Sequence, residues 1–167
     1  MIPEEAQKFI GRVDAPYVRE VERGAIARYV DAVGNDNLLY RNEEYARKTK
    51  YGGVISPPGF FGWPVHTEPA SESIIAAMAA IEKAGFTRLL DGGIVYDFIR
   101  PVRAGDKLIV YMKVKDITER QTKGGSMIVM ELESNYLNEN GDLVAKSVQT
   151  LIVGVQPVAL TQTMTKQ

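Results

Sequence analysis

The sequence predicts an α+β fold, in which helices from the first half of the chain cover an antiparallel sheet formed by the second half. Two observations carry this prediction. Apolar residues recur at helical spacing in two segments before residue 85, and they alternate with other residues in four segments after residue 93. The first pattern is typical of amphipathic helices and the second of strands with one buried face. Helices followed by a run of strands indicate the α+β class.

The first half of the chain predicts a short strand and then two main helices. Residues 17–21, YVREV, are rich in β-prone side chains. A helix is predicted over residues 23–33, because apolar residues fall there at i, i+3, i+4 and i+7, and Gly34 suits its end. A second helix is predicted to open at Ser71 and to end near Gly85.

Shorter helical segments are expected at residues 3–10 and 43–49. Four glycines and four prolines fall within residues 51–70, so long regular structure is not expected there. The last residues, 156–167, are expected to form a loose tail. The chain is therefore predicted to be a single domain over residues 1–167, with its core at about 16–154.

From residue 93 onward the hydrophobic period changes to two. The alternation predicts four strands, around residues 94–98, 108–114, 128–132 and 144–152. Gly124-Gly125 and Asn140-Gly141 lie between the later segments and suit tight hairpins, because such residues tolerate positive φ angles. Successive hairpins predict an antiparallel meander with one apolar face, which a helix from the first half would cover.

The composition argues against several classes of function. The net charge is −1, from 20 basic and 21 acidic residues, so sequence-independent nucleic-acid binding is not expected. No apolar stretch reaches the roughly 18 residues of a membrane span, and no signal-peptide pattern is visible, so a cytoplasmic location is expected. With no cysteine and one histidine, no thiolate or multi-histidine metal site is expected, and no cofactor is predicted.

Three stretches of the sequence carry a resemblance to a known family: AVGNDNLLYRNEEYA, YGGVISPPGF, and LLDGGIVYDFIRPVRAGDKL with the hairpins that follow it. Over residues 16–154 the chain resembles the MaoC-like dehydratases, in particular the N-terminal dehydratase domain found in subunits of (3R)-hydroxyacyl dehydratases. The resemblance implies a hot-dog fold, a curved antiparallel sheet wrapped around a central helix. It also implies hydration of a trans-2-enoyl thioester, or the reverse dehydration.

Active members of that family read Gly-Asp-x-Asn-Pro-x-His in the first stretch, where the Asp and His hold the water that is added. An ungapped alignment fills the Asp, Asn, Pro and His positions with Asn35, Asn37, Leu38 and Tyr40. An amide does not take up a proton near neutral pH, and a tyrosine with its ordinary pKa of ~10 is a poor base there. The resemblance therefore implies a site that keeps its scaffold and has lost its proton-transfer groups.

Other residues leave alternatives open. Asp36 becomes the missing acid if the alignment shifts by one residue, and is otherwise a solvated turn residue. Tyr40 is either a hydrogen-bond donor to the substrate or a packed aromatic. His66, the only histidine, is either a replacement base or a polar loop residue. Asn37 either contacts a ligand or bonds the backbone of its own turn.

Substrate-binding candidates follow from the same resemblance. Gly59 offers the first free amide after Pro57-Pro58, where the family starts its central helix, and is the candidate for the oxyanion hole. Phe60, Phe61 and Trp63 are candidates for lining an acyl pocket, with plain core as the alternative. The region up to Leu90 would hold a further helix that roofs this pocket or covers a subunit interface.

Two groups of basic residues complete the set. Arg47, Lys48 and Lys50 either contact the phosphates of coenzyme A or form a solvated helix face. Arg100 and Arg103 are expected to fix the loop between two strands.

The resemblance implies a subunit of an enoyl-thioester hydratase or 3-hydroxyacyl-thioester dehydratase, a hydro-lyase. Its ligand would be an acyl thioester of coenzyme A or acyl carrier protein. Its partner would be a hot-dog subunit with an intact Asp-His pair, in a hetero-oligomer, with a homodimer as the alternative. Two other functions remain open: a self-sufficient hydratase that uses Asp36, Tyr40 or His66, and a non-enzymatic acyl-thioester-binding protein.

Overall fold

The first main helix of the chain ends at a glycine in the left-handed conformation. The computed structural model describes residues 2–60 and 71–155. Helix α2 (Arg23–Ala32) ends in a Schellman motif, in which the N–H of Asn35 donates to the carbonyl of Val30 at 3.0 Å. Gly34 supplies the required positive φ, +64°. The predicted helix and its glycine stop are confirmed.

Side-chain caps start the helices that follow. Asn37 caps α3 (Leu38–Arg41), Asn42 caps α4 (Glu43–Arg47) and Ser71 caps α5 (Glu72–Lys83), each by accepting from a backbone N–H of the first turn. The helix predicted at residues 3–10 is shorter, because α1 covers Glu4–Gln7 only. After it the chain turns to join the sheet, where the N–H of Gly11 donates to the carbonyl of Val114 at 2.8 Å.

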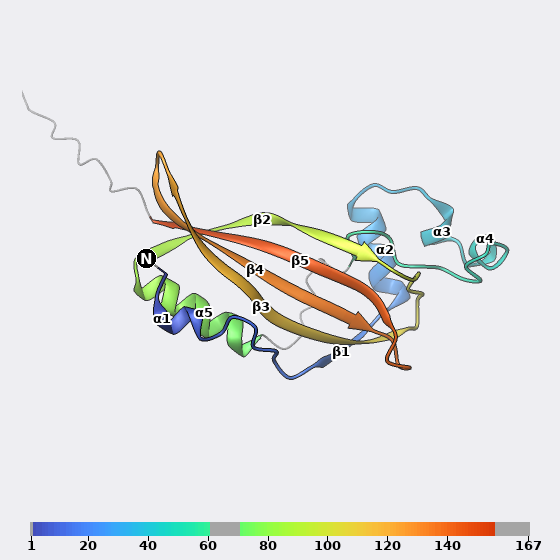
Figure 1. Ribbon diagram of the computed structural model, residues 1–167. Coiled ribbons are helices and arrows are strands. Elements are labelled where there is room, and N and C mark those ends of the chain that lie inside the picture. The colour runs from blue at the N-terminus through green and yellow to red at the C-terminus, as the bar shows by residue number, and fades with distance from the viewer. Residues whose placement is uncertain (1, 61–70, 156–167) are drawn as a thin grey trace, which may run out of the picture.

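Among the described residues the sheet has five strands, all paired antiparallel: the four expected from alternation and the short strand predicted at residues 17–21. They are β1 (Tyr17–Glu20), β2 (Phe86–Phe98), β3 (Lys107–Thr122), β4 (Gly125–Leu137) and β5 (Leu143–Val155). Their order is β1-β3-β4-β5-β2. The predicted meander is therefore correct for β3, β4 and β5 and wrong for β2, which pairs with β5 at one edge of the sheet (Figure 1).

The start of β2 was misplaced by the sequence pattern, which begins at residue 94, whereas the strand begins at Phe86. A register shift between Asp91 and Gly93 interrupts the strand. At Gly92 a Cβ atom would lie 3.0 Å from the carbonyl oxygen of Thr150, so glycine allows the close approach of β5 there. The irregularity breaks the alternation of side chains and hides the first half of the strand.

Two groups of helices cover opposite ends of the sheet. Figure 1 shows α1 and α5 side by side against one end, with α2, α3 and α4 at the other. One buried cluster joins α5 to the middle of the sheet through residues such as Ile81, Met130 and Val114. The other joins α2 to the sheet through residues such as Ile26 and Val110. Helices of the first half therefore cover the sheet, as expected, with one group at each end.

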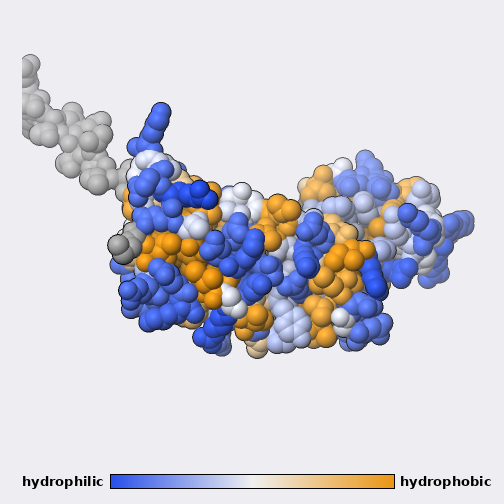
Figure 2. Space-filling model, viewed as in Figure 1, coloured by the Kyte–Doolittle hydropathy of each residue, from blue (hydrophilic) through white to orange (hydrophobic). Residues whose placement is uncertain are grey.

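A pair of buried serines separates the two clusters. Ser134 and Ser147 face each other across β4 and β5, and both are buried. Along β4, Ser134 lies between Leu132 of one cluster and Tyr136 of the other. Apolar patches broken by hydrophilic side chains also appear on the surface in Figure 2. In the part of the chain that the structure describes, no helix is long and apolar enough to cross a membrane.

Candidate functional site

The turn after α2 holds Asn35, the residue predicted from the ungapped alignment to occupy the family's Asp position. The side-chain oxygen of Asn35 accepts a hydrogen bond from the backbone N–H of Asn37 at 3.0 Å. Its backbone carbonyl accepts from Nε of Arg41 at 2.7 Å, and Nη1 of Arg41 also pairs with Asp31 at 2.5 Å. The Asn35 amide is thus engaged in shaping the turn, the usual role of asparagine at such a position.

The neighbouring polar residues also have structural environments. Asn37 accepts from the N–H of Leu39 at 3.0 Å, so the interpretation as a backbone-bonding turn residue is confirmed. Asp36 is exposed, and the described part of the chain gives it no hydrogen bond or ion pair. A general acid needs a positioned contact with the reacting group. The structure provides Asp36 with no such support.

Tyr40, predicted to occupy the family's His position, is half-buried and packs against the cluster under α2. Within residues 2–60 and 71–155, no hydrogen bond joins Asn35 to Tyr40. The two residues follow the same helix end, as the sequence implies. From the resemblance we expect the side chains of Asn35 and Tyr40 to converge on one cleft, with Gly59 across it. This expectation stays a prediction.

A residue that sequence reasoning did not single out lies directly beside Gly59. The hydroxyl of Tyr29, on α2, donates to the carbonyl of Pro58 at 3.3 Å. Gly59 has φ +85°, and a Cβ atom at this position would lie 2.5 Å from the Tyr29 oxygen. The Gly59 N–H has no acceptor among the described residues. The amide proposed for the oxyanion hole is therefore unengaged there, in a turn that only glycine fits.

One signal in the sequence marks Tyr29, namely its place in the apolar stripe of α2. A half-buried tyrosine needs a partner for its hydroxyl, but that partner is 29 residues away in the sequence. Phe60, directly after Gly59, has 3₁₀-helical conformation, and the residues that would continue the family's central helix lie outside the described ranges.

The aromatic candidates for the acyl pocket fall into two groups. Phe60 is 4% exposed and packs edge-on against Tyr29, with ring centroids 6.0 Å apart. This burial agrees with the core alternative. Phe61, Trp63 and His66 lie outside the described residues.

The basic residues near the turn are matched by acidic ones. Arg47 pairs with Glu43 at 2.9 Å and Lys48 with Glu44 at 2.7 Å, both at i, i+4. The ammonium of Lys50 lies 5.1 Å from the ring centre of Tyr51. A phosphate at this helix would compete with these carboxylates, so the pairing favours a solvated helix face.

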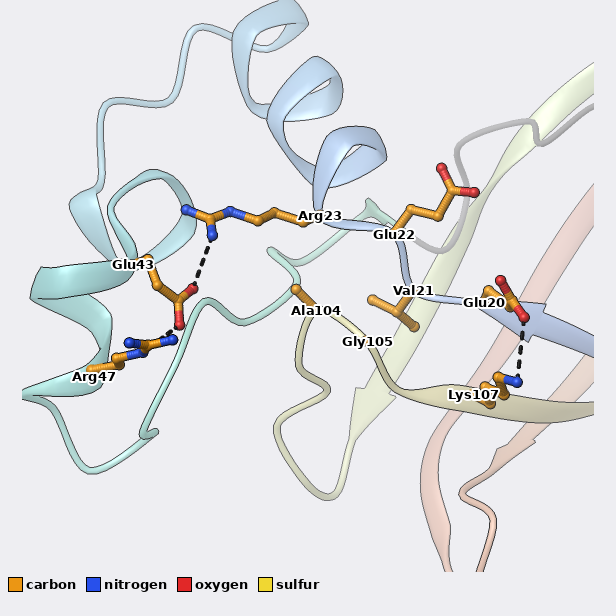
Figure 3. Close-up of a pocket in the computed structure, with 9 residues that line it drawn as sticks. All are labelled: Glu20, Val21, Glu22, Arg23, Glu43, Arg47, Ala104, Gly105 and Lys107. Atoms are coloured by element: carbon orange, nitrogen blue, oxygen red, sulfur yellow. Dashed lines mark hydrogen bonds and ion pairs between the residues drawn. The ribbon is translucent and has the colours of Figure 1, made fainter.

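Arg47 also lines a cavity of about 450 Å³ between α4, the start of α2 and the edge of β3 (Figure 3). In Figure 3, Arg23 and Arg47 both point toward Glu43, while Lys107 pairs with Glu20. The residues that line the cavity are Glu20, Val21, Glu22, Arg23, Glu43, Arg47, Ala104, Gly105 and Lys107. Charges of both signs line this cavity, and it includes neither Asn35 nor Tyr40, so it is distinct from the candidate site.

The second pair of arginines fixes loops, as predicted. Arg100 pairs with Asp142 at 2.8 Å, and Nε of Arg103 donates to the carbonyl of Tyr51 at 2.6 Å. The latter bond ties the loop before β3 to the segment that leads to Pro57. Over the residues that the structure describes, no cluster of His, Cys, Asp and Glu side chains fits a metal ion.

The profile of a family described as "FAS1-like, dehydratase domain region" matches residues 8–147. A UPF0336 protein of Thermobifida fusca is 31% identical over 148 residues, covering 87% of this chain and 91% of that protein. A UPF0336 protein of Mycobacterium tuberculosis is 32% identical over 135 residues, covering 79% and 78%.

Solved structures share the fold. The ChsH1-ChsH2 complex from Mycobacterium tuberculosis matches with a TM-score of 0.79 at 16% identity, covering 92% of this chain and 96% of the matched chain. The HadBC (3R)-hydroxyacyl-ACP dehydratase complex of the same organism matches at 0.65 and 22%, covering 86% and 96%. R-hydratase PhaJ1 from Pseudomonas aeruginosa matches at 0.59 and 19%, covering 93% and 87%. The predicted hot-dog fold is confirmed.

Proposed function

The chain belongs to the FAS1-like dehydratase-region family, among the MaoC-like hot-dog proteins, and from this we propose that it is a subunit of an enoyl-thioester hydratase or 3-hydroxyacyl-thioester dehydratase. Its partner would carry the intact Asp-His pair, and this chain would complete the assembly and shape the acyl pocket. The ligand would be an acyl thioester of coenzyme A or acyl carrier protein.

One observation carries the proposal that this chain leaves catalysis to a partner. The residue at the family's Asp position is Asn35, whose side-chain oxygen is held by the N–H of Asn37. An amide in that role neither gives nor takes a proton in the reaction. With Tyr40 at the His position, both proton-transfer groups are missing from the scaffold. A water molecule bound there would lack a base to activate it.

The edge of the sheet supports an assembly. β2 is an edge strand whose outer side no described strand pairs. Its large apolar side chains are exposed, among them Leu89 at 53% and Val95 at 67%. Long apolar edges are rarely left open in solution, because they pair with other chains. The ChsH1-ChsH2 and HadBC structures are both complexes, which supports assembly of this chain with a second hot-dog subunit.

The test compares the purified chain alone with the chain co-expressed with a hot-dog protein that carries Gly-Asp-x-Asn-Pro-x-His. Hydration of crotonyl-CoA and longer enoyl-CoA substrates is measured in both. The chain alone should be slower by at least ~10²-fold, the usual effect of losing one positioned acid–base group. Robust hydration by the chain alone that disappears on His66→Ala or Asp36→Ala would establish a self-sufficient enzyme. Binding of acyl-CoA with no active partner would establish a non-enzymatic binding protein.

A further inference from the structure

We propose that Tyr29 is a positioning residue, which aims the backbone N–H of Gly59 at the carbonyl oxygen of a bound acyl thioester. The inference rests on the proposed function, because it takes an acyl thioester as the ligand. It assigns a role to a side chain on α2 that lies outside the three stretches carrying the resemblance. The inference depends on the geometry of one peptide unit, the one that joins Pro58 to Gly59.

The peptide unit between Pro58 and Gly59 links the Tyr29 hydroxyl to the direction of the Gly59 N–H. No peptide bond among the described residues is cis, so the Pro58 carbonyl and the Gly59 N–H lie in one plane and point in opposite directions. The Tyr29 hydroxyl donates to that carbonyl at 3.3 Å. This bond fixes the rotation of the peptide plane. It therefore turns the Gly59 N–H away from α2, toward the opposite side of the turn.

The other backbone amides of the turn are not available. Pro57 and Pro58 have no N–H, and the N–H of Phe60 donates to the carbonyl of Pro57 at 3.2 Å. The Gly59 N–H has no acceptor among the described residues. It is half-buried, where a donor without a partner is unfavourable. A carbonyl oxygen that carries negative charge during reaction is the acceptor that such a donor stabilises best.

The packing around Tyr29 makes its hydroxyl a fixed point. Its ring packs against the buried cluster that contains Ile26 and Val30 and meets the buried Phe60 edge-on. At Gly59, a Cβ atom would lie 2.5 Å from the Tyr29 oxygen, so this oxygen sits directly against the turn. Substitution by phenylalanine would keep the ring in place and remove only the hydroxyl. The hydrogen bond can thus be tested apart from the packing.

The experiment uses Tyr29→Phe, with Tyr45→Phe as the matched control, since Tyr45 lies on α4 and is 47% exposed. The probe is butyryl-CoA with ¹³C at the thioester carbonyl, which cannot be hydrated because it has no double bond. Two signals are followed. One is the amide resonance of Gly59 in the ¹⁵N-labelled chain, alone and with an unlabelled partner. The other is the infrared band of the labelled carbonyl, which moves to lower frequency on hydrogen bonding.

In the wild-type chain and in Tyr45→Phe, butyryl-CoA should shift the Gly59 amide resonance and lower the carbonyl frequency. In Tyr29→Phe, binding should weaken by less than about tenfold, the effect of one neutral hydrogen bond, while most of the carbonyl shift is lost. A bound probe that leaves the Gly59 resonance unmoved, or a full carbonyl shift in Tyr29→Phe, would overturn this inference and leave the proposed function standing. Absence of any binding, alone and with the partner, would overturn both.

Discussion

The carboxylate of Asp14 accepts a hydrogen bond from the backbone N–H of Ser73 at 3.1 Å, and so joins the segment before β1 to the first turn of α5. It also accepts from the hydroxyls of Ser71 and Ser73. Burial by itself raises the pKa of Asp14, but the hydrogen bonds from Ser71 and Ser73 outweigh it, so the pKa lies below its usual value of 3.8. The folded state therefore holds this carboxylate in its charged form.

Removal of this charge should make the protein less stable near neutral pH and less sensitive to acid. A lowered pKa in the folded state contributes stability above the unfolded pKa of about 3.9, and that contribution is lost as pH falls through the folded pKa. Asp14→Asn should lower the free energy of unfolding at pH 7 by about 2 kcal/mol, the scale of hydrogen bonds to a charged group. Urea unfolding between pH 7 and pH 3 measures both effects.

Asp36→Asn is the control for this experiment, because Asp36 is exposed and has no hydrogen bond or ion pair within the described residues. It should change the free energy of unfolding by less than about 0.5 kcal/mol at pH 7. If Asp14→Asn loses as much stability between pH 5 and pH 3 as the wild-type chain does, the Asp14 contacts do not contribute to acid sensitivity.

The contact between Tyr29 and Gly59 predicts a coupling in a double-mutant cycle. Gly59→Ala places a Cβ atom against the Tyr29 oxygen and forces alanine to a φ of +85°. In Tyr29→Phe the clash is removed, since the next Tyr29 atom is 3.6 Å away, and only the backbone strain remains. Gly59→Ala should therefore cost less stability in the Tyr29→Phe background, by about 1 kcal/mol or more. Additive effects would contradict the contact.

Restoration of the missing groups tests the lost Asp-His pair. In Asn35→Asp the carboxylate can still accept from the N–H of Asn37, so the turn survives the change. Together with Tyr40→His it should give detectable but slow hydration of crotonyl-CoA, whereas each single variant should do little. The rate should remain well below that of an intact enzyme, because Leu38 replaces the family's proline and a misplacement of ~1 Å costs ~10²-fold.

The matched control introduces an aspartate and a histidine at the next helix, α4, instead of at the candidate site. Asn42 caps α4 by accepting from the N–H of Tyr45, and Tyr45 is exposed. The variant Asn42→Asp with Tyr45→His introduces the same side chains away from the candidate site. Equal activity in this control and in the Asn35–Tyr40 double variant would show that the restored rate does not come from the family's site.

The exposed edge strand should mediate association. Val95→Lys on β2 places a charge on the apolar edge and should raise the dissociation constant for the partner at least about tenfold. Val18→Lys on β1, at the opposite edge of the sheet, is the control, because Val18 has a similar exposure of 61%. Light scattering of the chain with its partner measures the effect. Equal weakening by both variants would argue against β2 as the docking edge.

Local signals in the sequence predicted the helices well. Gly34 and Ser71 mark a helix end and a helix start through backbone and capping preferences, and those act within a few residues. The assignment of Asn35 and Tyr40 to the family's Asp and His positions stays a prediction, because it depends only on residue identities in an ungapped alignment. The contacts that the side chains of Asn35 and Tyr40 make in the structure could not be predicted from the sequence.

Long-range contacts were the part that the sequence did not reveal. The pairing of β2 with β5 joins residues such as Tyr96 and Ser147, and no hairpin signal specifies it. The register shift at Gly92 removed the alternation from the first half of β2. The sequence pattern shows Tyr29 only as one more apolar position on α2. Its hydrogen-bond partner, the carbonyl of Pro58, is 29 residues away, so no local signal indicates the contact.

The serine pair between the two apolar clusters has a mechanical consequence. Ser134 and Ser147 interrupt the hydrophobic contact along the strands, so packing around α2 and packing around α5 rely on separate sets of side chains. Regions that share few buried contacts open and close with separate free energies. The end with Tyr29, Asn35 and Gly59 should therefore open with a free energy different from that of the end under α5, and amide hydrogen exchange would measure the two separately.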